Sequence, residues 1–410
     1  MNFQEITEKE YTSFLNNHPL RTFLHTPNIA KMRAVDGWEH IYLGIKNNNK
    51  IIAATMLLSR NEFASKKEFY AIRGFLIDYN NYELLKFFTT CIKKYIRKNN
   101  GFILRIDPYI MKQQRDVNGD IVQNGINNKR IIENLRNLGF KERNPEQVKW
   151  MFTLDIENKT LEQILKDMKP NTRNSINKTF KENLIIRTLK YDELDKFVKI
   201  TDDTSKRRNF ANKGIEYNHE MYKLFGDEVK YVIAELDTED YLNKLNLEYE
   251  KENNTLKKLN NSNSKKFIEQ QSKVNILSKR INEALLLKEK GSKIPLAASM
   301  FMLYGYEIIY LFSGNYKEYM NLHAQYRIQY EMIKYGIENG YKIYNFYGIS
   351  GNFDPNDDRY GIYAFKKGFN GTVVELIGEY DIPVNRIYYF LYKIINLSKK
   401  CIKKIIKFNK

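Results

Sequence analysis

The chain has 410 residues, more than one ordinary domain contains, so we expect two or three domains. Apolar residues make up 42% of the chain and charged residues 28%, which is ample material for packed cores. The absence of a long uncharged apolar run excludes a transmembrane helix, and the N-terminus lacks the features of a signal peptide. Two cysteines, Cys91 and Cys401, exclude a disulfide scaffold or a cysteine-based zinc site and favour a cytosolic location.

The charge balance points to the kind of partner. Lysine and arginine total 67 and aspartate and glutamate total 49, which gives a net charge of +18. A surplus of this size favours a polyanionic partner: nucleic acid, a nucleotide diphosphate or an anionic membrane face. An AT-rich genome that encodes lysine and asparagine freely explains the surplus equally well, so charge alone does not identify the partner.

Residues 1–148 show a mixture of helix and strand patterns. Strands are predicted at 40–45, 51–57 and 69–72. A helix is predicted at 83–98 from apolar residues with a 3.6-residue period, ended by Asn99-Asn100-Gly101 and followed by a strand at 102–108. The same order of helix, Asn-Gly stop and strand returns at 326–346, which suggests two related α/β halves.

The segment between these halves has a different character. From 237 to 290 there is no proline and almost no glycine, and apolar residues fall at heptad a and d positions on either side of a polar turn: Leu242, Leu245, Tyr249, Leu256 and Leu259, then Phe267, Val274, Leu277, Ile281 and Ala284. This pattern predicts an antiparallel helical hairpin with arms roughly 30 Å long. Strand-like flanks at 229–234 and 296–301 indicate an insertion in a strand connection.

The C-terminal segment 386–410 is predicted to be a basic amphipathic helix. Its apolar residues share one face, and lysines occupy most of the rest: Ile387, Leu391, Ile394, Ile402 and Ile405 against Lys393, Lys399, Lys400, Lys403, Lys404 and Lys407. Such a helix suits an anionic membrane surface. A helix packed on the protein's own core, with its lysines in solvent, fits the pattern as well.

Familiar catalytic motifs are missing. The chain has no P-loop, no G-x-G-x-x-G after a strand, no H-x-x-x-H pair and no G-x-S-x-G elbow. We therefore predict no metal, no cofactor and no nucleophile. An enzyme of this kind needs a substrate that arrives already activated.

Four segments nevertheless stand out. In residues 73–79, Arg73 and Asp78 carry opposite charges on either side of an apolar strand end. A structural strand with an ordinary ion pair is the alternative interpretation. Residues 169–178 begin a basic helix, with Asn171 as its expected N-cap, and its cations suit either phosphates or solvent.

Residues 308–315 are expected as a strand that enters a small-residue loop, where free backbone N–H groups could bind an anion or carbonyl; an ordinary βα turn is the alternative. The fourth segment pairs 347–351 with 361–369, in which two lysines framed by aromatic residues and glycines are unusual for a purely structural strand.

These segments resemble the FemABX family of aminoacyl-tRNA-dependent peptidyltransferases, and more closely its FemA and FemB branch. The matching pieces occur in family order over nearly the whole chain: Arg73-Gly74-x-x-Ile77-Asp78-Tyr79, Ile106-Asp107-Pro108-Tyr109, Asp203-Thr204-Ser205, Asn345-Phe346-Tyr347-Gly348-x-Ser350-Gly351 and Phe365-Lys366-Lys367-Gly368-Phe369. Each motif is weak by itself, but the ordered set is specific. The helical hairpin also falls where FemA-like members carry theirs.

The resemblance implies an α/β (α+β) fold with two tandem GNAT-like acyltransferase domains and an inserted antiparallel coiled-coil hairpin. The expected boundaries are 1–148 for the first GNAT-like domain, 149–236 and 292–385 for the second, 237–291 for the hairpin and 386–410 for the basic C-terminal helix. It also implies transfer of an amino acid from its tRNA ester to an amine of a peptidoglycan precursor.

The resemblance places Lys366, with Phe365 beside it, at the reaction centre, where the lysine would stabilise the oxyanion or the tRNA 3′ end. Asp78 matches a carboxylate that could hold or deprotonate the attacking amine. Arg33 stands where the family usually has a lysine against the precursor diphosphate. Lys213, four residues before Tyr217, stands where an arginine is common, and lysine cannot make the two-pronged contact of arginine. The remaining predicted residues are Arg73, Ser313 and Gly314 for substrate and Lys169, Arg173 and Lys178 for tRNA.

The expected partners are an aminoacyl-tRNA donor and an acceptor that is either lipid II or the soluble UDP-linked muramyl pentapeptide. The expected location is the cytoplasm, with peripheral contact at the inner face of the membrane. Two alternatives stay open: an acyl-CoA-dependent N-acyltransferase and a non-catalytic RNA- or membrane-binding protein. The acetyltransferase pyrophosphate signature is missing from both halves, which argues against acetyl-CoA as the donor.

Overall fold

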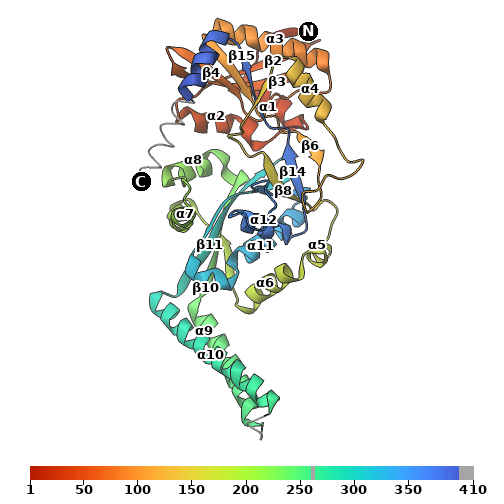
Figure 1. Cartoon of the computed structure of the whole chain (residues 1–410). Helices are drawn as coiled ribbons and strands as arrows, with labels where there is room; N and C mark the ends of the chain where they lie inside the picture. Colours follow the sequence, from red (N-terminus) through yellow and green to blue (C-terminus); the bar gives the residue numbers. More distant parts are fainter. Residues whose placement is uncertain (260–263, 397–410) are drawn as a thin grey trace. The chain divides into compact units, whose positions relative to one another are not determined.

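A computed structural model describes residues 1–259 and 264–396 (Figure 1). The chain divides into two compact units, each assembled from separate segments. Unit 1 contains 1–154, 345–367 and 371–410, and unit 2 contains 155–344 and 368–370. These units divide the chain at other places than the domain boundaries expected from the sequence, which stay predictions.

Unit 1 is built on a seven-stranded sheet with the strand order β1-β2-β3-β4-β5-β15-β7. The strands are β1 (Asn2–Glu5), β2 (Glu39–Asn47), β3 (Lys50–Phe63), β4 (Lys66–Ala71), β5 (Gly101–Ile106), β7 (Lys141–Arg143) and β15 (Glu379–Pro383). All pairs are antiparallel except β4 and β5, which run parallel. The strands predicted at 40–45, 51–57 and 69–72 are confirmed.

The helices of unit 1 are α1 (Glu8–Asn17), the short 3₁₀ helix η1 (Phe23–His25), α2 (Pro27–Ala34), α3 (Tyr82–Lys98) and α4 (Lys129–Asn137). The helix predicted at 83–98 is α3, which connects the parallel strands β4 and β5. The Asn81 side chain caps its start by accepting the Leu84 N–H. Its apolar face is buried against the sheet through Leu85, Phe88, Ile92 and Ile96.

Unit 1 also holds a second set of strands in the order β6-β14-β8-β13. They are β6 (Met111–Gln114), β8 (Trp150–Asp155), β13 (Ile343–Gly348) and β14 (Thr372–Leu376). Between β13 and β14 lies α12 (Tyr360–Lys367). The lysine pair Lys366-Lys367 is therefore in the last turn of a helix and not in a strand.

Unit 2 carries the strands β9 (Ile185–Thr188), β10 (Val229–Asp237), β11 (Lys293–Tyr304) and β12 (Glu307–Asn315), in the antiparallel order β12-β11-β10-β9. Its helical elements outside the hairpin are α5 (Leu161–Asp167), α6 (Pro170–Lys181), η2 (Tyr191–Glu193), α7 (Leu194–Arg208), α8 (Ile215–Phe225), η3 (Gly226–Glu228), η4 (Lys317–Leu322) and α11 (Ala324–Glu338).

Two local expectations in unit 2 are wrong. The N-cap of α6 is Lys169 rather than Asn171, because Pro170 takes the first helical position, where its missing N–H costs nothing. Residues 313–315 are not a loop. They belong to β12 and pair with β11 up to Ala297 and Asn315. The Asn315 N–H is not free either, because it donates to the Thr204 hydroxyl at 2.9 Å.

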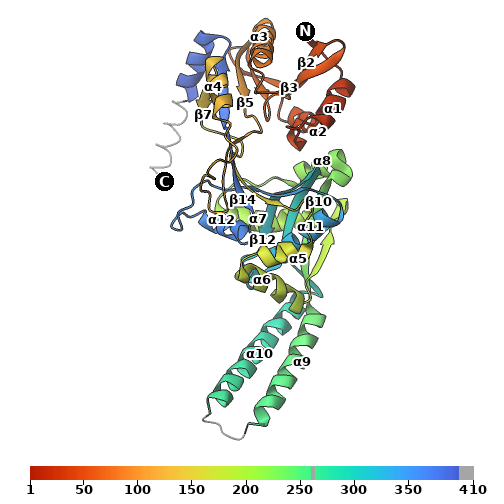
Figure 2. The same ribbon diagram turned by 90° about the vertical axis from the view of Figure 1, so that its right-hand side faces the viewer.

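The insertion between β10 and β11 forms a helical hairpin, which we call the arm, made of α9 (Thr238–Lys257) and α10 (Lys265–Lys290). The two helices lie side by side in both views (Figures 1 and 2). Six of the ten predicted seam residues are buried: Leu242, Leu245, Leu256, Val274, Leu277 and Ala284. The helices and their insertion point match the prediction, while coiled-coil packing stays a prediction.

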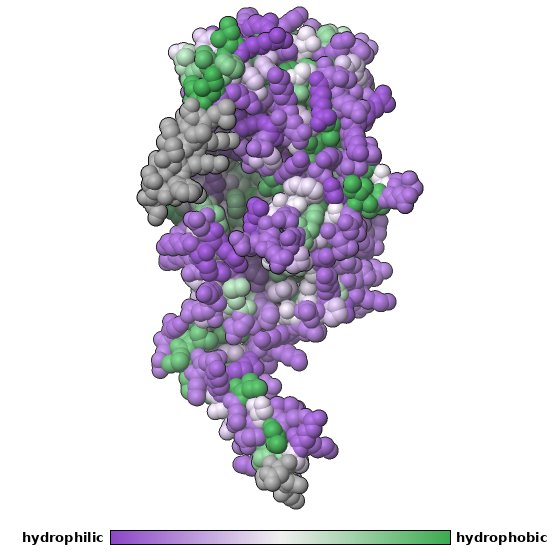
Figure 3. All heavy atoms as spheres, viewed as in Figure 1, coloured by the Kyte–Doolittle hydropathy of each residue, from purple (hydrophilic) through white to green (hydrophobic). Residues whose placement is uncertain are grey.

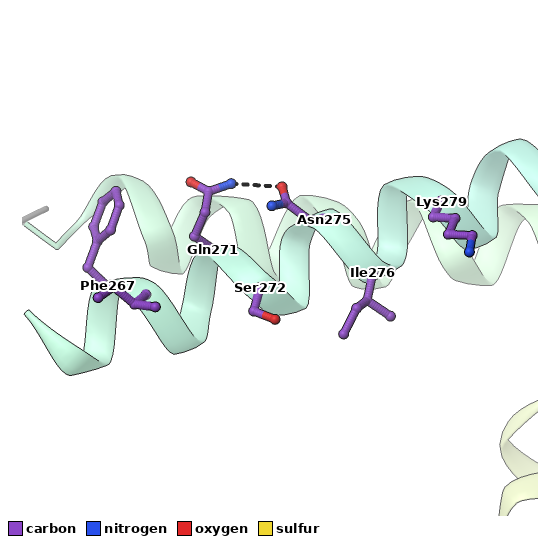
Figure 4. Close-up of a pocket in the computed structure, with 7 residues that line it drawn as sticks. Phe267, Gln271, Ser272, Asn275, Ile276 and Lys279 are labelled. Atoms are coloured by element: carbon purple, nitrogen blue, oxygen red, sulfur yellow. Dashed lines mark hydrogen bonds between the residues drawn. The ribbon is translucent and has the colours of Figure 1, made fainter. Parts of the chain in front are cut away.

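The face of α10 that points away from α9 carries a shallow hollow in the N-terminal half of the helix. Figure 4 shows the side chains that line it, among them Phe267, Ser272, Ile276 and Lys279, and the Gln271 amide donates to Asn275 at 2.9 Å. The motifs of the FemABX resemblance lie elsewhere in the chain.

Residues 386–396 are helical, and the rest of the predicted C-terminal helix, 397–410, lies outside the described residues. Among the helices of residues 1–259 and 264–396, none combines the length and the apolar character that crossing a bilayer requires.

Candidate functional site

The motifs of unit 1 meet at a buried ion pair. Arg73 follows β4, Asp107 follows β5, and the guanidinium Nη1 lies 3.3 Å from the Asp107 carboxylate. The pair is almost fully buried, with side-chain exposures of 2% and 4%. Asp107 also accepts the Arg73 backbone N–H at 2.7 Å and the Tyr70 hydroxyl at 2.9 Å, so two hydrogen bonds and the ion pair hold the carboxylate.

The glycine after Arg73 is required by close packing. Gly74 has a φ of +81°, and a Cβ there would lie 2.6 Å from the Tyr79 hydroxyl and 2.8 Å from the Pro108 Cα. The Tyr79 hydroxyl in turn accepts the Phe75 N–H at 2.8 Å. Two family motifs, 73–79 and 106–109, are therefore interlocked at this point.

The Arg73 guanidinium connects these motifs to the end of β13. Its Nη2 lies 3.5 Å from the Tyr347 hydroxyl, and its Cζ lies 5.6 Å from the centre of the Tyr109 ring. Asn345 donates to the Tyr109 hydroxyl at 3.3 Å and accepts the Tyr347 N–H at 2.8 Å. Both Arg73 and Tyr347 have positive φ angles, +56° and +60°, an unusual conformation for large side chains that concentrates at functional sites.

Lys366 reaches the same strand end from α12. Its ammonium donates to the carbonyl oxygens of Phe346 at 2.6 Å, Tyr347 at 3.3 Å and Gly348 at 2.6 Å. Three acceptors match the three N–H donors of a protonated lysine. The side chain therefore fixes the backbone on both sides of Tyr347.

Burial shifts the protonation equilibria of this cluster. Lys366 is only 5% exposed, and desolvation lowers its pKa to about 7. Desolvation also raises the pKa of Asp107 to about 6, against the opposing effect of the Arg73 charge. The net pKa of Arg73 is above its usual range, because the attraction of Tyr347 and Asp107 outweighs its own desolvation. At neutral pH the Arg73–Asp107 pair is ionised, and Lys366 is close to its midpoint.

The other predicted catalytic and acceptor residues of unit 1 have more local contacts. Phe365 is half-buried beside Lys366 in α12. Asp78 is exposed, and its carboxylate accepts the Asn80 N–H at 2.9 Å in the turn before α3. Arg33 lies in the last turn of α2 and pairs at 3.9 Å with Asp36.

A second cluster lies in unit 2, where α7 packs against β12. Gly314 is essential to this contact, because a Cβ there would lie 2.6 Å from the Ile200 carbonyl oxygen. Thr204, from the motif at 203–205, accepts the Asn315 N–H at 2.9 Å. Ser313 accepts the Tyr310 hydroxyl at 2.6 Å, and Gln325 donates to the Gly314 carbonyl at 2.9 Å.

Lys213 and Tyr217 form a pair near the start of α8. The Lys213 ammonium stands 4.9 Å from the centre of the Tyr217 ring, a cation–π arrangement that leaves the lysine exposed.

The three predicted tRNA-binding residues lie along α6 but differ in availability. Lys169 and Lys178 are exposed, and Lys178 donates to the Asn321 carbonyl at 3.0 Å. Arg173 uses one nitrogen to bond three carbonyls at the end of α5, including Lys166 at 2.7 Å and Met168 at 2.5 Å. Part of the Arg173 guanidinium is therefore occupied by the protein itself.

Four members of the unit 1 cluster lie in the quoted motifs without being predicted as site residues: Asp107, Tyr109, Asn345 and Tyr347. Their positions in 106–109 and 345–351 were a usable signal. The positive φ of Tyr347 and its approach to Arg73 had no counterpart in the sequence pattern, since they depend on how β4, β5 and β13 are placed.

Comparisons with known proteins show which family the chain belongs to. The model of the FemAB family matches residues 6–398. The chain is 32% identical to an aminoacyltransferase FemA of Staphylococcus epidermidis over 420 aligned positions, which cover 98% of this chain and 100% of that protein. It is 30% identical to an aminoacyltransferase FemA of Staphylococcus aureus, covering 97% and 99% of the two chains.

Among solved structures, the crystal structure of FemX superposes with a TM-score of 0.74 at 22% identity, covering 95% of this chain and 99% of that one. This likeness shows that the two share a fold. The fold and the family match together define the chain as a transferase with a mixed α/β architecture. It belongs to the FemAB family, and the resemblance found in the sequence is confirmed.

Proposed function

We propose that the protein is an aminoacyltransferase that moves a small amino acid from aminoacyl-tRNA to an amine of a peptidoglycan precursor, for cross-bridge synthesis. Glycine is the first candidate, with serine and alanine next. The observation that carries the proposal is the meeting of four family motifs in one network, from Asp107 through Arg73 and Tyr347 to Lys366. The relatives named aminoacyltransferase FemA support the reaction class.

The proposed reaction needs no covalent enzyme intermediate. The acceptor amine attacks the ester carbonyl, a C–N bond forms, the C–O bond to the tRNA ribose breaks, and the amine proton ends on that ribose oxygen. Because the ester is already activated, alignment of amine and ester supplies much of the rate, and effective molarities reach about 10⁵ M or more. Donors placed at the tetrahedral oxygen supply a further part.

Lys366 has two proposed roles in this scheme. Its ammonium holds the carbonyls of Phe346 and Gly348, which positions Tyr347, and its charge stabilises the oxyanion or the tRNA 3′ end. Phe365 lies beside it. Asp78 is exposed, as a carboxylate that holds the attacking amine must be.

Donor and acceptor binding follow from the cationic side chains. Lys169 and Lys178 on α6 are proposed to contact tRNA phosphates, with Arg173 contributing its remaining donors. Arg33 is proposed to contact the acceptor diphosphate. Lys213 is proposed to bind the acceptor as well, with Tyr217 holding its ammonium in place. Arg73, Ser313 and Gly314 shape the surroundings of the substrate.

The acceptor is proposed to be lipid II or its soluble UDP-linked precursor, and a lipid-linked acceptor implies that the protein works at the inner face of the membrane. Two assays test the proposal. In the first, glycyl-, seryl- and alanyl-tRNA, each with a labelled amino acid, are incubated with lipid II and, separately, with the UDP-linked pentapeptide. Transfer of label to either acceptor supports the proposal, and no transfer from any donor contradicts it.

The second assay measures tRNA affinity. Lys169→Gln with Lys178→Gln is expected to weaken binding and to reduce its salt dependence. Lys334→Gln with Lys342→Gln, on other parts of unit 2, is the matched control. Equal losses in both variants would show that general charge, not α6, binds the RNA.

A further inference from the structure

The helix at 386–396 has two apolar faces. One faces inward: Tyr389 and Tyr392 are 8% and 9% exposed and pack with Phe102 and Ile103 of β5. The Arg105 guanidinium donates to the Tyr392 hydroxyl at 3.2 Å, and the Asn385 side chain accepts the N–H groups of Ile387 and Tyr388 at the helix start. The helix is therefore fixed in its rotation about its own axis.

Its opposite face consists of large apolar side chains exposed to solvent. Ile387, Phe390 and Leu391 are 72%, 65% and 42% exposed, and Ile394 and Ile395 continue the stripe at 45% and 37%. At 100° per residue these positions fall on the side opposite Tyr389 and Tyr392. Figure 3 shows the stripe as a green patch at the upper left, where the last blue helix of Figure 1 lies.

The charge of this segment is entirely positive. Residues 386–410 contain eight lysine or arginine residues and no aspartate or glutamate. An apolar stripe flanked by cations is complementary to a bilayer with anionic headgroups, since the aliphatic groups enter the acyl boundary while the cations meet phosphates.

We propose that the stripe of Ile387, Phe390 and Leu391 is a docking surface for an anionic lipid bilayer. A second copy of the chain would bring two strongly cationic segments together, which electrostatic repulsion opposes. RNA would use the cations but not the exposed aliphatic and aromatic side chains. The protein was proposed above to work at the inner face of the membrane, and this stripe is the surface by which it would bind there. This inference does not depend on the transfer reaction.

The experiment is vesicle co-sedimentation of the full-length protein. Vesicles contain equal amounts of phosphatidylglycerol and phosphatidylcholine, or phosphatidylcholine alone, and no peptidoglycan precursor. The test variant is Ile387→Ser with Phe390→Ser and Leu391→Ser. The matched control removes three exposed apolar side chains from the arm, Leu247→Ser with Ile268→Ser and Ile276→Ser, which are 68%, 60% and 58% exposed.

The wild type and the arm variant are expected to bind the anionic vesicles alike, and the stripe variant about tenfold or more weakly. Binding is also expected to fall with added salt and with phosphatidylcholine alone. Equal binding by the stripe variant and the wild type overturns the proposal, as does equal binding to both kinds of vesicle. A stripe variant that changes sedimentation velocity without lipid would assign the surface to self-association and overturn it too. Because no acceptor is present, failure here leaves the transfer assay unaffected.

Discussion

The guanidinium of Arg73 and the carboxylate of Asp107 lie 3.3 Å apart with almost no access to solvent. Removing one member of a buried pair leaves the other charge uncompensated. Asp107→Ala is therefore expected to lower the free energy of unfolding by about 3–5 kcal/mol, measured by urea denaturation. Asp195→Ala removes the exposed partner of Lys199 and should cost less than about 1 kcal/mol. Similar decreases in the free energy of unfolding for both variants would contradict the burial of the Arg73–Asp107 pair.

Lys366→Met removes the ammonium that three carbonyls surround, while keeping most of the side-chain volume. If that charge acts at the oxyanion, the transfer rate should fall by about 10²–10³. Lys367→Met is the control, because the neighbouring lysine is directed to the Tyr363 ring at 5.3 Å and should be dispensable. Circular dichroism and thermal melting verify the fold. Full activity in Lys366→Met would remove Lys366 from the mechanism.

The pH dependence of transfer should report the same group. Burial lowers the pKa of Lys366 to about 7, so the ammonium is the main form below that pH and the neutral amine above it. If the charged form is active, the single-turnover rate falls as pH rises through 7, relative to Lys366→Arg, whose guanidinium stays charged. Rates are corrected for spontaneous ester hydrolysis. Parallel pH profiles for the two proteins would show that Lys366 is not the titrating group.

Gly314 is expected to tolerate no side chain. Its hypothetical Cβ lies 2.6 Å from the backbone oxygen of Ile200, and backbone cannot swing aside as a long side chain can. Gly314→Ala should destabilise the protein by about 1–3 kcal/mol in chemical denaturation. Gly361→Ala is the control, since nothing lies within 4 Å of that Cβ and alanine favours α12. If Gly314→Ala left the free energy of unfolding unchanged, α7 would be able to move away from β12 at little cost.

Local patterns in the sequence predicted α3, the strands around it and the two helices of the arm. Each of these elements carries its own signal: the 3.6-residue period of 83–98, the strand patterns at 40–45, 51–57 and 69–72, and the heptad spacing at 242–284. Local patterns did not identify the helix α12 at 360–367, and they ended the strand too early at 313–315, where pairing with the neighbouring strand β11 extends β12.

The candidate site was predictable through its motifs but not through its contacts. The sequence shows Arg73 and Asp78 five residues apart with opposite charges, yet the partner of Arg73 is Asp107, thirty-four residues away. Only the parallel pairing of β4 with β5 brings them together. Charge proximity along the chain is thus a poor guide to buried pairs, because strand pairing decides which side chains meet.

The strand β15 has a bearing on how the protein is made. It forms from residues 379–383 but lies between β5 and β7, so it joins two strands made of residues 101–106 and 141–143. Until residues 379–383 have left the ribosome, β5 keeps one unpaired edge and β7 has no neighbour. A nascent chain stalled before residue 379 should consequently need chaperone protection, and a shortened gene product ending there should aggregate.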